Sequence, residues 1–383
     1  MKILVLGAGR MGYGAAFDLV HNSPGVEHVT IADFDRDKAE NVAAKVGTDR
    51  ITARQADAAM PEEVADLFRG HDSVISCINY WYNESLSQTA IASGVNFCDL
   101  GGNNYVVDAQ LRLDAGAKAR GISIIPDCGL APGMVSVLAA HGAANFDQLD
   151  ELHIRVGGLP QDPQPPLDYQ LVFSVEGLIN EYIEVARCIR EGKITEVPSM
   201  TEVESLSFAE FSEPLEAFQT SGGTSTLPDT FLGKVKELDY KTIRYAGHCE
   251  KFKAMIDLGL CSSDAIEVGP VKVKPRAVFG NLLEMHLPAD GPDYVLVRLE
   301  FSGTSKGASK RLRYDIVDKQ DEDTGLSAMM RTTAFPASII AQMMAKGDVL
   351  ERGATPQETA IDHEKFVAEL DRRNIKIDVS EGH

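Results

Sequence analysis

The sequence predicts an α/β protein: a Rossmann doubly wound parallel sheet plus a second α/β domain with a mainly antiparallel sheet. Three observations lead to this fold class. The chain opens on a short apolar run that runs straight into a glycine-rich turn and a helical pattern. Short apolar runs and helical stretches then alternate up to about residue 145. Beyond residue 148, short segments of alternating polarity dominate, which is typical of antiparallel strands.

The first element is a strand at Ile3–Leu6, too short for a helix and apolar enough to be buried on both faces. Gly7, Gly9 and Gly12 follow in G-x-G-x-x-G spacing. A dinucleotide-binding turn needs one glycine for the tight turn, one for close approach to the pyrophosphate and one for helix packing. Apolar residues then recur at helical spacing at Ala15, Ala16, Leu19 and Val20. We expect a pyrophosphate at this helix N-terminus; the alternative is a structural βαβ unit without nucleotide.

The second strand, Val29–Asp33, ends in an acid about twenty residues after Gly12. A carboxylate at that place accepts hydrogen bonds from a free ribose diol and repels a 2′-phosphate, so Asp33 predicts NAD rather than NADP. Arg36 lies nearby, and it could pair with a phosphate or stand as an exposed residue of the next helix.

The chain continues with a helix over 36–46, a strand at Ile51–Gln55, a helix at Pro61–Phe68 and a fourth strand at Asp72–Asn79. The turn after the third strand is a usual place for an adenine contact, and the end of the fourth strand should lie by the nicotinamide ribose. An aromatic loop starting at Tyr80 follows. The predicted cofactor-binding residues are Gly7, Gly9, Arg10, Met11, Gly12, Asp33, Asp57, Ala58, Cys77, Ile78 and Asn79.

Two further strands complete the first sheet, at Val95–Leu100 and Ile122–Asp127, and a helix runs on to about residue 144. Ligands of such sheets sit beyond the carboxyl ends of the strands. Asn79, Asp99 and Asp127 lie at those ends, so we expect them along one edge of the sheet.

The second domain is predicted over residues 148–325. It begins with a strand near Leu152, passes through a proline-rich loop and contains a helix over Val175–Arg190. Short strands follow at Leu215–Phe218, Tyr240–Tyr245, Tyr294–Phe301 and Arg311–Val317. A helical stretch at Thr333–Ala345 returns the chain to the first domain. We therefore assign 1–147 and 326–383 to dinucleotide binding, and 148–325 to substrate binding and oligomerisation, with the cleft between the two lobes.

Composition narrows the function. The 383 residues carry a net charge of −20, which argues against nucleic acid or an anionic membrane as partner. No apolar run approaches the length of a membrane span, and the first strand starts almost at Met1, so we expect no signal peptide and a cytoplasmic location. The six cysteines form no C-x-x-C pair, and the nine histidines are dispersed without metal-ligand spacing, so no metal is predicted.

A dehydrogenase that acts on an amine or an alcohol needs a base, a clamp for the substrate's fixed charge and a floor beneath the nicotinamide. Three segments offer such groups: Asp127–Gly133, Ser221–Pro228 and Lys241–His248. Each has a structural alternative. Asp127 could cap the following helix, Arg244 could be an exposed strand residue, His248 could be structural, and Ser221–Pro228 could be only a turn. The spacing alone predicts a two-lobed dehydrogenase of unspecified substrate.

At these residues the chain resembles the saccharopine dehydrogenase-like family, and within it most resembles the lysine 6-dehydrogenases. The matching segments are Asp127–Met134, Phe173–Tyr182, Leu215–Phe218, Thr220–Pro228, Lys241–His248 and Arg331–Pro336. One departure is Ala246, where the family usually has proline. This difference concerns backbone stiffness more than chemistry.

The resemblance implies NAD-dependent oxidative deamination of L-lysine at its ε-amino group, which gives allysine, its cyclic form 1-piperideine-6-carboxylate, NADH and ammonia. It implies that Arg244 binds the α-carboxylate with help from Thr224, while Glu176 binds the α-ammonium. Asp127 would hold the reacting amine or take its proton, with His248 as the alternative base.

Tyr80 completes the predicted substrate site, and a homo-oligomer is expected. The alternatives are a saccharopine dehydrogenase or a related opine-type reductase of secondary amines, and a non-enzymatic NAD-binding regulator. The length of 383 residues favours the smaller substrate, because saccharopine enzymes of this type tend to carry extra helical sequence in the second domain.

Overall fold

The structure is a computed structural model that describes residues 1–382, and the chain forms two compact units. Unit 1 comprises Met1–Asn145 and Met330–Lys376, and unit 2 comprises Phe146–Met329 and the residues from Ile377 onward. Residues 377–382, assigned from the sequence to the first domain, belong to unit 2. The reason is that the last strand, β18 (Asp378–Gly382), pairs with β16 of the second sheet.

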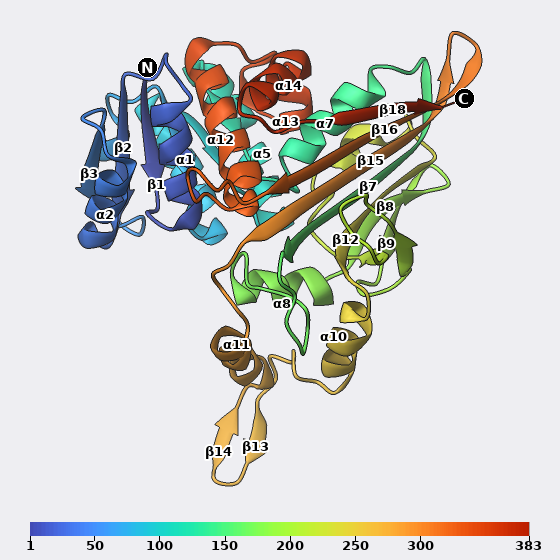
Figure 1. Ribbon diagram of the computed structural model, residues 1–383. Coiled ribbons are helices and arrows are strands. Elements are labelled where there is room, and N and C mark those ends of the chain that lie inside the picture. Colours follow the sequence, from blue (N-terminus) through green and yellow to red (C-terminus); the bar gives the residue numbers. More distant parts are fainter. Residues whose placement is uncertain (383) are drawn as a thin grey trace. The chain divides into compact units, whose positions relative to one another are not determined.

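Unit 1 contains a seven-stranded sheet in the order β17-β6-β5-β4-β1-β2-β3, and all its pairings are parallel. Its strands β1, β2 and β3 lie side by side in the blue part of Figure 1. The order 3-2-1-4-5-6 within it is that of a doubly wound dinucleotide-binding sheet. The strands are β1 (Lys2–Leu6), β2 (His28–Asp33), β3 (Ile51–Gln55), β4 (Ser73–Ser76), β5 (Asn96–Asp99), β6 (Ser123–Ile125) and β17 (Gly353–Ala354).

The helices of unit 1 connect these strands and follow them in the C-terminal segment. They are α1 (Arg10–His21), α2 (Arg36–Val46), α3 (Pro61–Phe68), the short 3₁₀ turn η1 (Tyr80–Tyr82), α4 (Asn83–Ser93), α5 (Asn104–Leu111), α6 (Asp114–Arg120), α7 (Met134–Ala143), α12 (Ala328–Lys346), α13 (Gln357–Ala360) and α14 (His363–Arg372). The core around the strands is fully buried at Phe68 and Phe97.

A buried polar cluster ties the C-terminal segment to the first helix of unit 1. Asp18 of α1 is fully buried, and its Oδ1 lies 2.7 Å from Nε of Arg373. Ser23 accepts hydrogen bonds from both Arg373 and Gln342 of α12. A buried ion pair persists only when its charges are well paired, so this cluster fixes where the returning segment packs.

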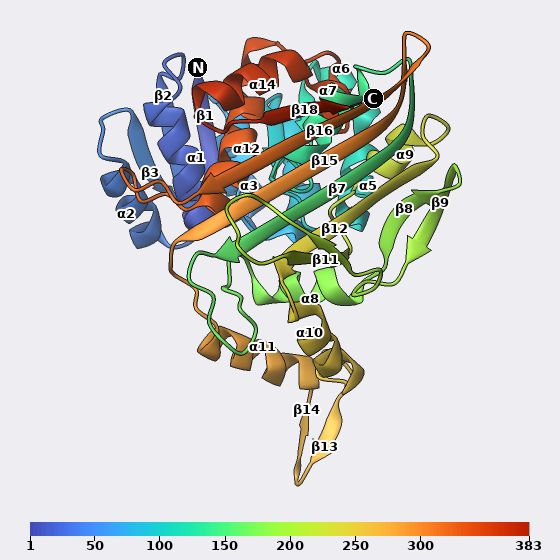
Figure 2. The same ribbon diagram turned by 45° about the vertical axis from the view of Figure 1, so that its right-hand side comes forward.

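Unit 2 is built on a nine-stranded sheet whose main path is β10-β11-β12-β7-β15-β16-β18, with β8 and β9 attached beside β12. Among the described residues of this sheet, only β7 and β12 pair in parallel. The long strands β7, β15 and β16 run antiparallel side by side (Figure 2). The strands are β7 (Gln148–Pro160), β8 (Ala186–Arg190), β9 (Lys193–Val197), β10 (Glu204–Leu206), β11 (Leu215–Gln219), β12 (Glu237–Tyr245), β15 (Asp293–Ser305), β16 (Ala308–Lys319) and β18.

The helices of unit 2 are α8 (Val175–Ile183), α9 (Leu227–Phe231), α10 (His248–Asp257) and α11 (Pro275–His286). The helix predicted over Val175–Arg190 is correct only to Ile183, because Ala186–Arg190 is strand β8 and pairs with both β9 and β12. A separate hairpin, β13 (Ile266–Val268) and β14 (Val271–Val273), completes the unit. Within residues 1–382, no helix is long and apolar enough to cross a membrane.

Candidate active site

The glycine turn after β1 is packed so closely that two of its glycines have no room for a side chain. Gly7 has φ +97°, and a Cβ there would lie 2.7 Å from Ile78 Cγ2 and 2.8 Å from the Cys77 carbonyl oxygen. A Cβ on Gly12 would lie 1.8 Å from the Gly7 carbonyl oxygen. The turn conformation and the packing of α1 against the turn therefore explain both glycines.

Gly9 is different, because no protein contact explains it. Its φ of −80° suits any residue, and a Cβ there would meet nothing within 4 Å. Gly9 is also the N-cap of α1 and brings no capping side chain. Open space at a helix N-terminus that lacks a side chain is what a bound pyrophosphate requires, so unit 1 fits a dinucleotide at this place.

Asp33 is the last residue of β2, and its side chain reaches back to the same turn. Its Oδ2 accepts a hydrogen bond of 2.7 Å from the Ala8 N–H, and its Oδ1 accepts one of 2.9 Å from the Asp35 N–H. The carboxylate is therefore held in place beside the glycine turn. Arg36 forms an ion pair with Glu40, at 2.6 Å between Nε and Oε1, on the exposed surface of α2.

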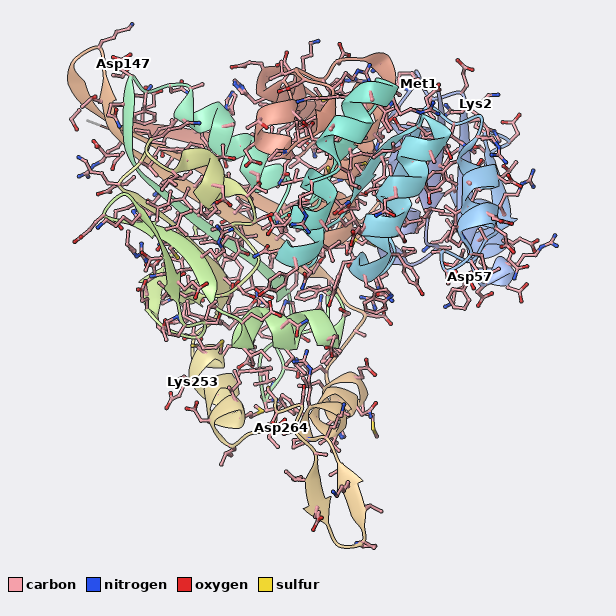
Figure 3. The ribbon with its side chains drawn as sticks, turned by 180° about the vertical axis from the view of Figure 1, so that it is seen from behind. Met1, Lys2, Asp57, Asp147, Lys253 and Asp264 are labelled. Atoms are coloured by element: carbon pink, nitrogen blue, oxygen red, sulfur yellow. The ribbon has the colours of Figure 1, made fainter. Side chains whose placement is uncertain are left out.

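The structure also brings the end of β4 to the glycine turn, since Cys77 and Ile78 are the residues that crowd Gly7. Asp57 and Ala58 lie in the turn after β3, where the exposed Asp57 carboxylate accepts from the Ala59 N–H (Figure 3). Of the other predicted cofactor residues, Asn79 and Arg10 are exposed and Met11 is half-buried.

A second polar group forms where β5 and β6 end. Asp99 is buried, and its Oδ1 accepts from the N–H groups of Gly101 and Asp127 while its Oδ2 accepts from Gln110. Burial raises the pKa of Asp99 despite these hydrogen bonds. A Cβ on Gly101 would lie 1.9 Å from Asp127 Oδ1, so the Asp127 carboxylate packs where Gly101 has no side chain.

Asp127 is buried and has a φ of +59°, a left-handed conformation that is uncommon for a non-glycine residue, although aspartate adopts it more readily than most. The N-cap of α7 is Gly133, so Asp127 does not cap that helix. Strain of this kind clusters at functional sites, which keeps Asp127 a candidate for proton transfer. Tyr80 is half-buried on η1, and a Cβ on Gly102 would lie 2.9 Å from its ring.

In unit 2, a group we name the Arg244 cluster joins side chains from β12, α8, α10 and the loop before α8. Its members are Tyr169, Glu181, Tyr182, Thr242, Arg244 and His248. Arg244 is buried, its Nε donates to the Tyr182 hydroxyl at 2.9 Å, and its guanidinium carbon lies 4.9 Å from the centre of the Tyr169 ring. Its Nη1 also donates to the Ile243 carbonyl oxygen at 2.9 Å, so two hydrogen bonds and the face of the Tyr169 ring hold the planar guanidinium.

The hydrogen bonds assign the proton positions of this cluster. His248 Nδ1 lies 2.9 Å from the carbonyl oxygen of Leu167, which can only accept, so Nδ1 carries the proton. His248 Nε2, 3.1 Å from the Tyr182 hydroxyl, is then the acceptor of that hydroxyl's hydrogen. Burial and the nearby Arg244 charge lower the pKa of His248 to about 3, so the imidazole is neutral. Burial raises the pKa of Tyr182, which keeps its proton.

A carboxylate completes the cluster. Glu181 Oε2 lies 4.0 Å from an Arg244 terminal nitrogen, and Glu181 Oε1 accepts from Thr242 at 2.6 Å. The turn predicted to bind substrate is adjacent, because the Ser221 N–H donates to the Glu181 backbone carbonyl. Glu216 of β11 accepts from two N–H groups in the first turn of α10 and so holds that turn, which contains His248.

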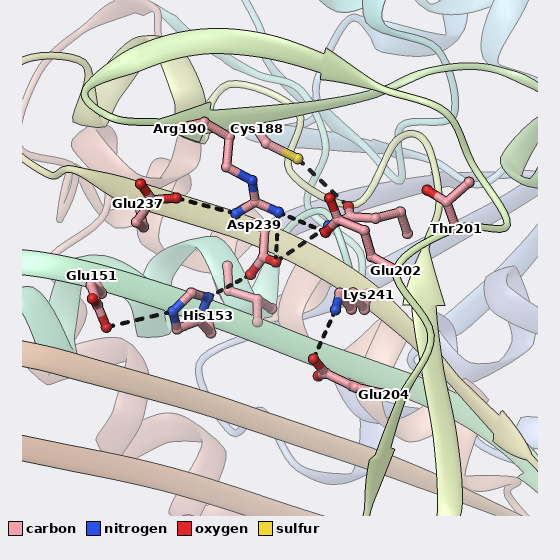
Figure 4. Close-up of polar contacts among 12 residues, drawn as sticks. Glu151, His153, Cys188, Arg190, Thr201, Glu202, Glu204, Glu237, Asp239 and Lys241 are labelled. Carbon is pink, nitrogen blue, oxygen red and sulfur yellow. Dashed lines mark hydrogen bonds and ion pairs between the residues drawn. The ribbon is translucent and has the colours of Figure 1, made fainter.

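The two cations of the segment Lys241–His248 point to opposite faces of the sheet, because side chains alternate along a strand. Lys241 pairs with Glu204 at 2.7 Å, and Arg190 pairs with Asp239 nearby (Figure 4). Arg155 joins these pairs into one network, because it contacts both Glu204 and Asp239. Although burial opposes it, the His153 and Arg155 contacts hold the pKa of Asp239 well below its usual range. Each charged side chain named in this network has an ion-pair partner within it, which indicates a structural role.

Two predicted substrate residues make other contacts. Glu176 is exposed on α8, and its carboxylate lies 2.7 Å from Arg276. Thr224 is buried and donates its hydroxyl to the Arg187 carbonyl. Further along α8 it is Glu181, rather than Glu176, that approaches Arg244.

Comparisons with known proteins agree with this two-unit arrangement. Residues 3–125 match the family model "Saccharopine dehydrogenase NADP binding domain", and residues 129–375, more than half of the chain, match "Saccharopine dehydrogenase C-terminal domain". The chain belongs to the saccharopine dehydrogenase family. The resemblance to the saccharopine dehydrogenase-like family is therefore confirmed, and so is the fold class.

Individual members of the family are distant from this chain. The L-glutamate-forming, NADP⁺ saccharopine dehydrogenase of Pyricularia oryzae is 27% identical over 54% of this chain and 46% of its own length. The Saccharomyces cerevisiae enzyme of the same name is 25% identical over 70% of this chain and 60% of its own. The chain thus spans about half of the relatives it matches. The apo structure of a yeast saccharopine dehydrogenase superposes with a TM-score of 0.83 at 18% identity, over the whole of both chains, which shows the fold.

Sequence reasoning overlooked Glu181 and Tyr182, although both belong to a segment of the family resemblance. The buried face of α8 carries Val175, Leu178, Ile179 and Tyr182, at helical spacing. That spacing places Tyr182 inward and Glu176 outward. The helical periodicity of this segment was therefore the sequence signal that could have predicted an inward Tyr182.

Proposed function

We propose that this chain is an NAD-dependent amino acid dehydrogenase that oxidatively deaminates L-lysine at its ε-amino group. The single observation that supports this most is the pairing of one buried guanidinium, Arg244, with one carboxylate, Glu181, in the same cluster. A guanidinium binds an α-carboxylate and a carboxylate binds an α-ammonium, so the pair matches the zwitterionic end of one amino acid. The other cations described near this cluster, Lys241, Lys251 and Arg276, are paired elsewhere.

The proposed roles of His248 and Asp127 follow from the protonation states of His248 and Tyr182. His248 is neutral, and its acceptor nitrogen already receives the Tyr182 hydrogen, so it orients Arg244 through Tyr182 and does not serve as the base. That leaves Asp127 to take the proton of the reacting amine. When bound, a nicotinamide would supply the acceptor for the hydride that leaves the ε-carbon. Water would then add to the substrate imine, which releases ammonia and leaves the aldehyde.

The amine sets the pH dependence of the reaction. A free lysine side chain has a pKa near 10.4, so well under ~1% is neutral at pH 7, and only the neutral amine can give up hydride. Turnover should therefore rise toward alkaline pH. An optimum near pH 6 would contradict these roles.

A second candidate, saccharopine oxidation, is supported by the names of the relatives. Saccharopine carries further carboxylates and would need further cations. The assay that separates the candidates follows absorbance of the reduced nicotinamide with L-lysine or saccharopine plus NAD, and with glutamate, allysine and NADH in reverse. We expect the highest kcat/KM with L-lysine. Turnover of saccharopine alone would establish the second candidate, and no turnover with any substrate would favour a nucleotide-binding regulator.

The cofactor choice is tested in the same assay with NADP. Asp33, fixed by two backbone N–H groups, and Arg36, paired with Glu40, support NAD over the NADP of the named relatives. A kcat/KM with NADP equal to that with NAD would contradict this. A homo-oligomer and a cytoplasmic location remain proposals; light scattering on the purified chain measures the first.

A further inference from the structure

Outside the candidate active site, the fold of unit 1 brings together two histidines that are far apart in sequence. His141 lies in the last turn of α7, and His363 is the first residue of α14, followed by Glu364. The two imidazole rings lie 5.4 Å apart in an edge-to-face arrangement. Their sequence separation explains why the dispersed histidines predicted no metal.

The ligand atoms of these three residues converge. Glu364 Oε1 lies 3.6 Å from His141 Nε2 and 3.9 Å from His363 Nδ1, and the ligand atoms of all three lie within 4.8 Å of one another. Nitrogen and oxygen ligands bind Zn²⁺ at about 2.0–2.2 Å, so ligand atoms of a tetrahedral site lie roughly 3.3–3.6 Å apart. The two separations from Glu364, 3.6 and 3.9 Å, are at or close to that spacing.

His363 supplies an independent indication. Its Nδ1 is buried and makes no hydrogen bond to any of the residues described in the structure. A bound water or ion commonly satisfies such a buried polar atom. The nearby cation Lys365 does not compete for Glu364, because its ammonium pairs with Asp348 at 2.9 Å.

We propose that His141, His363 and Glu364 form a binding site for a divalent transition-metal ion, with Zn²⁺ as the best match for two imidazoles and one carboxylate. Three protein ligands leave a fourth position for water. The ion would join α7 to α14, and thus the C-terminal segment to the helix that follows the Asp127 turn. A ligand that binds only the folded chain stabilises it.

The test uses the full chain after treatment with a chelator. Co²⁺ is titrated while its visible absorption is recorded, because that absorption reports coordination by protein ligands, and Zn²⁺ is then added as a competitor. We expect one equivalent of Co²⁺ per chain, displacement by Zn²⁺, and a higher thermal midpoint of unfolding with Zn²⁺ present.

The variants are His141→Gln, His363→Gln, Glu364→Gln and the double histidine variant, with His286→Gln as the matched control. His286 is an exposed histidine at the end of α11 in unit 2. Each single histidine variant should weaken binding at least about tenfold, or 1.4 kcal/mol, and the double variant should lose the thermal shift. The control should match the parent chain.

Two results would overturn the proposal: no Co²⁺ absorption with the parent chain, or an affinity that the double variant leaves unchanged. Thermal midpoints without metal show whether each variant folds. If a histidine variant does not fold, Glu364→Gln still tests the site. The Glu364 side chain is 76% exposed, so this change leaves the packing intact.

Discussion

The glycine turn of unit 1 and the Arg244 cluster of unit 2 each present fixed polar groups, but they are built in opposite ways. The turn is a run of adjacent residues, and two of its glycines, Gly7 and Gly12, are required by close contacts within the turn or with the end of the neighbouring strand. The cluster takes its side chains from β12, α8, α10 and the loop that contains Leu167. The spacing of residues in the sequence therefore predicts the glycine turn. The Arg244 cluster, in contrast, exists only once the sheet has formed.

The largest expected effect on stability comes from comparing alanine substitutions at two glycines of the same turn, Gly12 and Gly9. In Gly12→Ala the new Cβ would meet the Gly7 carbonyl, so α1 must shift, at a cost on the order of 4 kcal/mol or more in unfolding free energy. In Gly9→Ala the new Cβ contacts no protein atom, so the thermal midpoint of unfolding should not change, whereas the affinity for NAD should fall. Thermal unfolding and NADH fluorescence titration measure both. Equal NAD affinity in Gly9→Ala and the parent would disprove a pyrophosphate contact at Gly9.

The next effect compares the two buried cations of β12. Arg244→Ala should raise the KM for the amino acid substrate by an amount equivalent to about 2–5 kcal/mol, because a buried charge partner of the carboxylate is lost. Lys241→Ala removes a cation that pairs with Glu204 on the other face, so it should lower stability and leave KM unchanged. Steady-state kinetics decide the matter, and an unchanged KM in Arg244→Ala would remove Arg244 from the site.

This contrast also shows how far the sequence could lead. Strand ends, the glycine turn and Asp33 follow from local periodicity and spacing, so the sequence alone predicts them. The partners of Arg244 do not, because a hydrogen bond between residues 182 and 244 depends on the pairing of distant elements. The same reason separates Ala186–Arg190 from the preceding helix: its strand state comes from pairing with β9 and β12, which local propensity does not report.

The link between Arg244 and His248 is tested by Tyr182→Phe. This change removes one hydroxyl that both accepts from Arg244 and donates to His248, and it leaves two buried polar atoms unsatisfied. The expected loss is about 1–3 kcal/mol of unfolding free energy, together with a higher KM as Arg244 loses its orientation. Urea unfolding and kinetics measure the two effects, and a variant as stable as the parent would disprove the hydrogen-bond chain.

The neutral state of His248 predicts a pH dependence of stability. With a folded pKa of about 3 and an ordinary value of 6.5, the unfolded chain binds a proton between these pH values that the folded chain does not. Stability should therefore fall as the pH drops below 6.5, by at most about 1.4 kcal/mol per unit from this residue. His248→Gln keeps a donor and an acceptor but does not titrate, so its urea unfolding profile should be flatter. Parallel profiles would contradict a neutral buried imidazole.

The smallest expected effect decides between two carboxylates of α8. Glu176 is 61% exposed and pairs with Arg276, and an exposed ion pair is worth less than about 1 kcal/mol, so Glu176→Gln should change neither stability nor the lysine KM appreciably. Glu181→Gln should raise the KM, because the charge that faces Arg244 and binds the α-ammonium is lost. The isosteric change is the same in both variants, so the contrast isolates position on the helix. If Glu176→Gln raises the KM and Glu181→Gln does not, the ammonium binds away from the Arg244 cluster, and the match between that cluster and a single amino acid end is lost.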